Sequence, residues 1–306
     1  MFELAPNLIV VAGPTATGKT RLGVAIAKEL GSEIISADSR QVYRGMDIGT
    51  GKDISEYGSV PYHLIDIMEP TEEFNVYRFQ RLFYDLFEDI VFRLGVPPVL
   101  VGGTGLYIDS VVNRYSFKDV PKDESLREEL KEYSNEQLKE RLLKTDIKLH
   151  NSTDTTNRIR MVRAIEIAEM PMEISEQKKD IPHIFPLILG IRFEREQLRQ
   201  RITARLKQRF QEGMIEEVKS LYEQGVTYEK LDFFGLEYRM IGQYLQGNIK
   251  SRNDLFQKLN SAIHQFSKRQ TTWFRKMERE GAAIIWLNGN SENILQEALL
   301  HLHKSK

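Results

Sequence analysis

The stretch from Leu8 to Thr20 constrains the fold more than any other part of the sequence. An apolar run, Leu8–Ala12, leads into a segment bounded by glycines, Gly13–Thr20, and then into an amphipathic stretch. This is the pattern of a phosphate-binding loop between a strand and a helix, in which the glycines let backbone N–H groups turn toward an anion. Lys19 supplies a point charge, and Thr20 offers a hydroxyl to Mg²⁺ at the helix N-terminus. A strand–turn–helix corner without a ligand is the alternative, but such a corner has no need of the lysine.

The loop does not reveal the reaction. Phosphoryl transfer, nucleotide hydrolysis and the displacement of a whole diphosphate group all require a cradle for an anion. The rest of the chain must therefore distinguish among these chemistries.

Composition narrows the class of protein. The chain has 306 residues, of which 41% are apolar and 28% charged, enough for one large globular domain and an inserted one. The absence of cysteine excludes disulfides, thiolate metal sites and cysteine nucleophiles. No apolar run is long enough to span a membrane, and Met1-Phe2-Glu3 lacks the basic start of a signal peptide, so we expect a cytoplasmic protein without a membrane partner. A net charge of −1 argues against global steering of nucleic acid and leaves local basic helices as the informative feature.

The order of predicted elements indicates an α/β fold: a P-loop NTPase-like parallel sheet flanked by helices. Short buried strands are predicted at Leu8–Ala12, Glu33–Ala37, Val96–Val101, Phe185–Ile191 and Ala282–Leu287. Between residues 115 and 180 the chain is rich in Lys, Glu and Arg and has no strand-like run. We therefore predict a catalytic core of residues 1–114 and 183–306, interrupted by an all-helical insertion of residues 115–182.

Two polar residues follow predicted strands. Asp38 comes directly after Glu33–Ala37, and Thr104 follows Gly102 and Gly103 at the end of the next strand. In an open parallel sheet the ligand crevice lies beyond the carboxyl ends of the strands, so both should face the same space as Thr20. The alternatives are that Asp38 caps a turn, and that the glycines begin a helix without binding anything.

Basic helices provide the third signal. The periodicity predicts one long helix with Leu198, Ile202, Leu206, Phe210, Met214 and Val218 on its apolar face and several arginines on the other. A second, from Lys258 to Arg279, carries Lys268 and Arg269 among the aromatic residues Phe266, Trp273 and Phe274. Cations alternating with rings suit RNA, although an amphipathic helix that buries its aromatics has the same pattern. In the insertion, Arg158, Arg160 and Arg163 form either a solvated face or contacts to backbone phosphates.

Taken together, these motifs resemble the tRNA dimethylallyltransferases, also called tRNA isopentenyltransferases. The resemblance covers nearly the whole length and rests on the phosphate loop, on Ser36–Lys52, on Gly102–Tyr107, on Arg160–Ile167 and on Lys268–Arg275. The chain departs from the usual pattern at Thr17, where Ser is usual, and at Gly51, where Ala is common. No zinc-finger extension follows the core, which is typical of the bacterial form.

The resemblance implies transfer of a dimethylallyl group from dimethylallyl diphosphate to N6 of the adenosine at position 37, just 3′ of the tRNA anticodon, with release of diphosphate. It makes Asp38, Thr104 and Arg205 the catalytic residues, with Asp38 accepting the hydrogen of the amine and Arg205 beside the departing diphosphate. The residues implied to bind the diphosphate are Gly13, Pro14, Thr15, Ala16, Thr17, Gly18, Lys19 and Thr20, the last also holding Mg²⁺. The residues implied to contact the anticodon stem-loop are Asp38, Ser39, Arg40, Gln41, Thr104, Arg160, Arg163, Lys268 and Arg269. We expect a monomer.

Three alternatives remain at this stage. A small-molecule kinase would use the same loop for ATP, but it would also need an adenine pocket and lid arginines. A transferase acting on free adenine nucleotides would share the chemistry without needing the basic helices. An RNA-binding module with a vestigial loop would have no reason to retain Asp38, Lys19, Thr20 and Arg205 together.

Overall fold

The computed structural model describes residues 5–117, 120–145, 155–170 and 181–304. The chain divides into two compact units. The core unit comprises Met1–Tyr115 and Pro182–Lys306, and the insertion unit comprises Ser116–Ile181.

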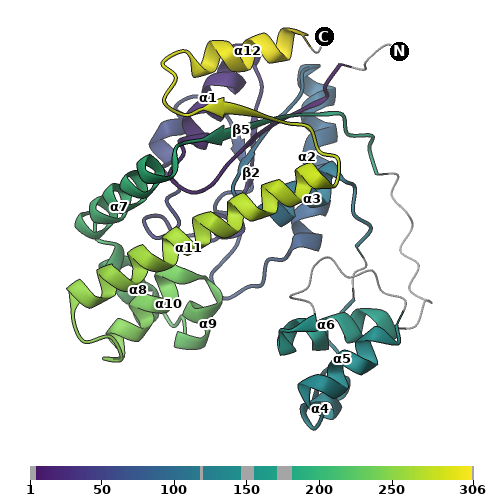
Figure 1. Ribbon diagram of the computed structural model, residues 1–306, viewed down its shortest axis with the longest axis vertical. Helices are drawn as coiled ribbons and strands as arrows, with labels where there is room; N and C mark the ends of the chain where they lie inside the picture. The colour runs from purple at the N-terminus through teal and green to yellow at the C-terminus, as the bar shows by residue number, and fades with distance from the viewer. Residues whose placement is uncertain (1–4, 118–119, 146–154, 171–180, 305–306) are drawn as a thin grey trace. The chain divides into compact units, whose positions relative to one another are not determined.

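A parallel sheet forms the centre of the core unit (Figure 1). Its six strands are ordered β3-β2-β4-β1-β5-β6, and neighbouring strands pair in parallel throughout this order. Their bounds are β1 Leu8–Ala12, β2 Ile34–Ala37, β3 Tyr62–His63, β4 Val99–Gly102, β5 Pro186–Arg192 and β6 Ile284–Asn288. Ala12, Ala37 and Gly102 lie in register, so β1, β2 and β4 end side by side. The predicted fold class is confirmed, and the segments after these three strands emerge at one edge of the sheet.

Helices cover both faces of the sheet because β1 is apolar on both sides. Ile9 and Val11 pack in one cluster with α1 (Lys19–Leu30) and α12 (Ile294–Lys304). Leu8, Val10 and Ala12 face the other cluster, which contains α2 (Val76–Leu94), α3 (Gly105–Val112) and α11 (Arg252–Arg279). This second, larger layer also places α11 beside the ends of the strands that carry the site.

The prediction of one continuous basic helix around residues 195–218 is wrong in one respect. The structure breaks it into α7 (Arg195–Gln211) and α8 (Met214–Glu223), with Gly213 at φ 99° between them. The apolar spacing of four continues across the break because both helices pack on the same core. Two shorter helices, α9 (Tyr228–Phe233) and α10 (Leu236–Leu245), then lead to α11.

The described residues of the insertion unit form three helices joined by turns and irregular segments: α4 (Glu124–Lys131), α5 (Asn135–Leu143) and α6 (Arg158–Glu169). The capping box predicted at the start of α5 is present, with Ser134 accepting from Gln137 N and the Gln137 side chain accepting from Ser134 N. Leu130, Leu142 and Ile165 meet in a small core of their own. Within the described ranges of the whole chain, no helix combines the length and apolar character that crossing a membrane requires.

Candidate active site

The phosphate loop joins β1 to α1 in the form that the sequence predicts. Gly13 has φ 155°, and a Cβ there would lie 2.9 Å from the carbonyl oxygen of Ile191, so only glycine fits against β5. The hydroxyl of Thr17 and the ammonium of Lys19 both donate to the carbonyl oxygen of Pro14, at 2.9 and 2.8 Å. These contacts curl the loop around the first turn of α1, where the backbone N–H groups of a helix N-terminus attract an anion.

Lys19 of the loop lies within reach of charged side chains from other elements. Burial, together with the positive charge of Arg205, lowers the pKa of Lys19 to about 8, and the carboxylate of Asp38 opposes both effects. These interactions show that Asp38 and Arg205 both lie close enough to Lys19 to act on its charge. A buried ammonium beside a guanidinium is stabilised when an anion binds between them.

Asp38 and Thr104 lie next to each other, as expected from the ends of β2 and β4. Asp38 Oδ1 accepts the backbone N–H of Arg40 at 2.9 Å. The hydroxyl of Thr104 accepts the backbone N–H of Ser39 at 3.3 Å, and Thr104 N donates to Ala37 O at 3.3 Å. Asp38 therefore caps a turn with one oxygen while its carboxylate also acts on the phosphate-loop lysine.

Helix α7 brings arginines to the loop. Arg205 forms an ion pair with Asp53 and donates to the carbonyl oxygen of Gly51 at 3.3 Å. Four residues earlier, Arg201 Nε donates to the carbonyl oxygen of Ala16 at 2.8 Å, and its guanidinium lies 4.5 Å from the ring of Phe193. The family resemblance implies a role for Arg205 and none for Arg201, although the spacing of four on one helix places both on the same face.

Arg209 follows Arg201 and Arg205 at the same spacing of four on α7, but it is not part of an exposed basic face. It is 8% exposed, and its guanidinium donates to the carbonyl oxygen of Gly49 at 3.3 Å. Burial, together with the charge of Arg205, lowers its pKa to about 10. A Cβ on Gly51 would lie 1.6 Å from Arg209 Nη2, so the departure from the usual Ala at this position makes room for the guanidinium.

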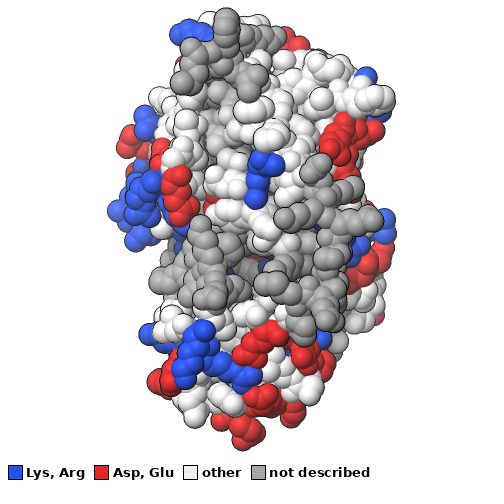
Figure 2. Space-filling model, turned by 90° about the vertical axis from the view of Figure 1, so that its right-hand side faces the viewer, with Lys and Arg blue, Asp and Glu red and all other residues white. Residues whose placement is uncertain are grey.

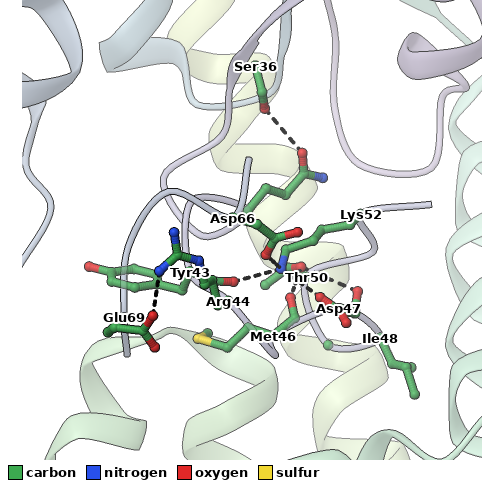
Figure 3. Close-up of polar contacts among 12 residues, drawn as sticks. Ser36, Tyr43, Arg44, Met46, Asp47, Ile48, Thr50, Lys52, Asp66 and Glu69 are labelled. Carbon is green, nitrogen blue, oxygen red and sulfur yellow. Dashed lines mark hydrogen bonds and ion pairs between the residues drawn. The ribbon is translucent and has the colours of Figure 1, made fainter. Parts of the chain in front are cut away.

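The loop that follows β2, residues 38–53, is held by a buried lysine (Figure 3). Lys52 is 1% exposed, and its ammonium donates to Tyr43 O and Asp47 Oδ1, both at 2.6 Å, and to the carboxylate of Asp66. All three of its N–H donors are thus used. The lysine fixes the course of the loop that carries Asp38 at one end and Gly51 at the other.

Glu217 of α8 anchors the same loop from the opposite side. Its carboxylate accepts the backbone N–H groups of Asp47, Ile48 and Gly49, at 2.8, 2.7 and 3.0 Å. It also accepts the hydroxyl of Tyr238 at 2.8 Å. Nothing in the local sequence around Glu217 identifies this role, since the loop lies 168–170 positions away in the chain.

The residues predicted to contact RNA lie in both units. Lys268 and Arg269 are exposed on α11, and the Arg269 guanidinium lies 5.7 Å from the exposed ring of Phe266. Of the other aromatics on α11, Phe274 is buried in the core and Trp273 donates to Asp109, so the pattern of rings there is mainly structural.

The insertion unit carries Arg160 and Arg163 on α6. Arg160 is exposed, whereas Arg163 donates to Val120 O at 2.6 Å and to Glu166 at 3.1 Å. Figure 2 shows acidic and basic side chains side by side on the face of this unit that it presents. What distinguishes the two arginines is therefore the exposure of their side chains, since Arg160 is exposed and Arg163 is half-buried.

A magnesium ion fits this site only if a bound substrate and water molecules supply most of the oxygen atoms that coordinate it. Among the described residues, no group of three or more His, Cys, Asp and Glu side chains is placed to hold a metal. Thr20 lies at the second position of α1, directly behind the lysine of the loop. One protein hydroxyl completed by phosphate oxygens and waters is a normal arrangement for Mg²⁺, which keeps part of its hydration shell.

These features define an α/β protein of P-loop NTPase-like fold in which the loop after β1 lies beside a carboxylate and a hydroxyl that follow the neighbouring strands. A model of the IPP transferase family matches residues 41–277, and one of the isopentenyl transferases matches residues 6–57. The chain therefore belongs to the IPP transferase family.

Individual relatives agree with this assignment. The chain is 58% identical to tRNA dimethylallyltransferase 1 of Geotalea uraniireducens, with 94% of each protein covered. It is 56% identical to tRNA dimethylallyltransferase 2 of Citrifermentans bemidjiense, over 96% of this chain and 94% of that one. The solved tRNA isopentenylpyrophosphate transferase of Bacillus halodurans matches with a TM-score of 0.71 and 34% identity over 98% of both chains. A eukaryotic dimethylallyltransferase acting on tRNA shares the fold, with a TM-score of 0.77 and 24% identity over 96% of this chain and 78% of that one.

Proposed function

We propose that the protein transfers a dimethylallyl group from dimethylallyl diphosphate to N6 of the adenosine at position 37 of tRNAs, releasing diphosphate. The names of its close relatives support this activity. The observation that carries it is the placement of Asp38 and Thr104 at the strand ends beside the phosphate loop, with Asp38 acting on the charge of Lys19. An acceptor amine and an allylic diphosphate can thus meet at one edge of the sheet.

Asp38 serves the acceptor. The exocyclic amine of adenine is a weak nucleophile, and it becomes acidic as its nitrogen bonds to the allylic carbon. The Arg40 N–H holds one Asp38 oxygen and orients the carboxylate, so that the other oxygen can accept the proton of the amine. Thr104, bonded to Ser39 N, positions the adenosine.

The phosphate loop serves the leaving group. As the carbon–oxygen bond breaks, negative charge grows on the diphosphate and is stabilised by Lys19, the loop amides and Arg205. Mg²⁺ on the Thr20 hydroxyl would supply further positive charge to the same oxygens. Arg205 is held toward the site by its contacts to Asp53 and Gly51.

RNA contacts are proposed for both units. Lys268 and Arg269, exposed on α11, neutralise backbone phosphates, and Arg160 adds to them from the insertion unit. The target base has to leave the stack of the anticodon loop to reach Asp38, as for other enzymes that modify a base. We place this reaction in the cytoplasm and assign it to a monomer, since one chain carries both subsites.

Isotope labels distinguish this activity from the kinase alternative. Purified protein is given unmodified tRNA with either labelled dimethylallyl diphosphate or γ-labelled ATP, and acid-insoluble RNA is counted. We expect only the prenyl label to enter RNA, and digestion to nucleosides to locate it on N6 of adenosine. An anticodon stem-loop with guanosine at position 37 is the matched control and should stay unlabelled. Incorporation of the ATP label, or of neither label, contradicts the proposal.

A further inference from the structure

The side chain of Gln270 on α11 is hydrogen-bonded both to the phosphate loop and to the segment that follows β4. Its side-chain oxygen accepts the backbone N–H of Thr15 at 2.9 Å, and its Nε2 donates to the carbonyl oxygen of Gly103 at 2.9 Å. One partner is a donor and the other an acceptor, so the orientation of the amide is determined by its contacts. Gln270 is 7% exposed, and its position is therefore set by the core of the protein.

The residues around Gln270 leave it little freedom to move. A Cβ on Gly103 would lie 2.5 Å from Gln270 Nε2 and 3.2 Å from the carbonyl oxygen of Gly13. The phosphate loop, the β4–α3 segment and the glutamine are thus in direct contact. Rotating the side chain away would leave the half-buried Thr15 N–H and the buried Gly103 O without these partners, which is unfavourable.

This contact changes what the phosphate loop can bind. A loop of this kind holds polyphosphates through successive backbone N–H groups that point inward. Here the N–H of Thr15 is already bonded, which leaves the amides from Ala16 onward for the ligand. The oxygen of Gln270 also places negative partial charge at that end of the loop, which disfavours an anion beside it.

We propose that Gln270 is a specificity-determining residue that restricts the phosphate loop to ligands with two phosphates and rejects those with three. This inference rests on the proposed function for the identity of the natural ligand. It explains how a loop of the kind that binds nucleoside triphosphates in other proteins can favour an allylic diphosphate over the triphosphates of the cell.

The test measures the affinity of the full-length protein for pyrophosphate and for inorganic triphosphate by calorimetry in the presence of Mg²⁺. The wild-type protein should bind pyrophosphate at least about tenfold more tightly, the factor expected from one charge-assisted hydrogen bond. Gln270→Ala and Gln270→Met, the latter of similar length, should bring the two affinities within about threefold, mainly by tightening the triphosphate. Gln265→Ala, an exposed glutamine on the same helix, should keep the wild-type ratio.

The outcomes are separable. Equal affinity of the wild-type protein for both probes, with prenyl transfer to tRNA intact, overturns this inference and leaves the proposed function standing. An unchanged ratio in whichever Gln270 variant melts cooperatively also overturns it. Failure of the wild-type protein to bind either probe and to transfer the prenyl group contradicts the proposed function itself.

Discussion

Asp38 combines a structural and a chemical contact in one side chain. One carboxylate oxygen accepts the N–H of Arg40, as a turn cap does, and the same carboxylate acts on the charge of Lys19 across the site. The two alternatives considered for this residue are therefore compatible. Substitutions can separate them because asparagine retains the oxygen that caps the turn but is a far weaker proton acceptor.

We expect Asp38→Asn to lower the single-turnover rate of prenyl transfer by roughly 10²–10⁴-fold, the range typical of general acid–base groups. Its melting temperature and pyrophosphate affinity should stay near wild type, because the cap to Arg40 N survives. Asp38→Ala, which removes the cap as well, is the comparison variant and should also lose stability. An asparagine variant within a few-fold of the wild-type rate shows that Asp38 is not the base.

The ammonium group of Lys19 should stabilise the complex of the protein with pyrophosphate and destabilise the ligand-free protein. Its pKa is lowered to about 8 by burial and by Arg205, so folding disfavours the charged form at neutral pH. The unfolded chain binds this proton more strongly, and the contribution of Lys19 to stability therefore rises as the pH increases from about 8 toward the ordinary value of lysine.

We accordingly predict that Lys19→Met raises the melting temperature of the ligand-free protein at pH 7 and abolishes the further rise that pyrophosphate causes in wild type. The affinity of the wild-type protein for pyrophosphate should fall as the pH increases through about 8, while that of the variant stays low throughout. Thermal melts with and without pyrophosphate at several pH values measure both effects. A variant that is less stable than wild type but still binds pyrophosphate would show that the lysine is structural.

At the scale of elements, the loop between β2 and β3 depends on helices far away in the chain. Glu217 binds three successive backbone N–H groups of this loop, and the carbonyl oxygens of Gly49 and Gly51 accept from Arg209 and Arg205 of α7. Arg205 is therefore placed by a loop that α8 holds in position.

We predict that Glu217→Ala lowers the free energy of unfolding by about 2–4 kcal/mol, because it leaves several half-buried donors without their acceptor. The single-turnover rate of prenyl transfer should fall by more than the loss of stability alone would cause, because the loop that positions Arg205 is no longer fixed. Urea denaturation and single-turnover assays below the unfolding transition measure the two effects. Glu216→Ala, exposed on the same helix, should change stability by less than about 0.5 kcal/mol. Equal values for the two variants would show that Glu217 does not anchor the loop.

At the scale of the whole molecule, the lysine of the loop after β1 and the cations proposed to contact RNA differ in their exposure to solvent. Lys19 is half-buried at the start of α1, whereas Lys268 and Arg269 lie exposed on α11 and Arg160 on the insertion unit. Exposed cations that release counterions give binding a strong dependence on salt.

Replacing Lys268 and Arg269 by alanine should raise the KM for tRNA and reduce the slope of log affinity against log salt by about 1 for each phosphate that is no longer neutralised. Pyrophosphate affinity should not change. Lys28→Ala with Lys304→Ala removes the same charge from other exposed positions and controls for net charge. If both double variants show the same salt slope as wild type, the α11 pair does not contact RNA.

The sequence by itself determined the features that depend on neighbouring residues. The phosphate loop follows from one short motif, and the location of Asp38 and Thr104 follows from parallel strands whose carboxyl ends share an edge. The spacing of apolar residues did not reveal that the chain changes direction between α7 and α8. The period of four continues through Gly213 because both helices pack on one core.

Tertiary structure alone decided the contacts that complete the site. Gln270 meets Thr15 across 255 positions, Arg201 meets Ala16 across 185, and Glu217 meets Ile48 across 169. No local pattern signals such a contact, because a helix presents the same sequence whether its polar side chain reaches solvent or a buried backbone amide. These contacts form only when the helices pack against the sheet, because a backbone N–H that is removed from water has to bond to an acceptor within the protein.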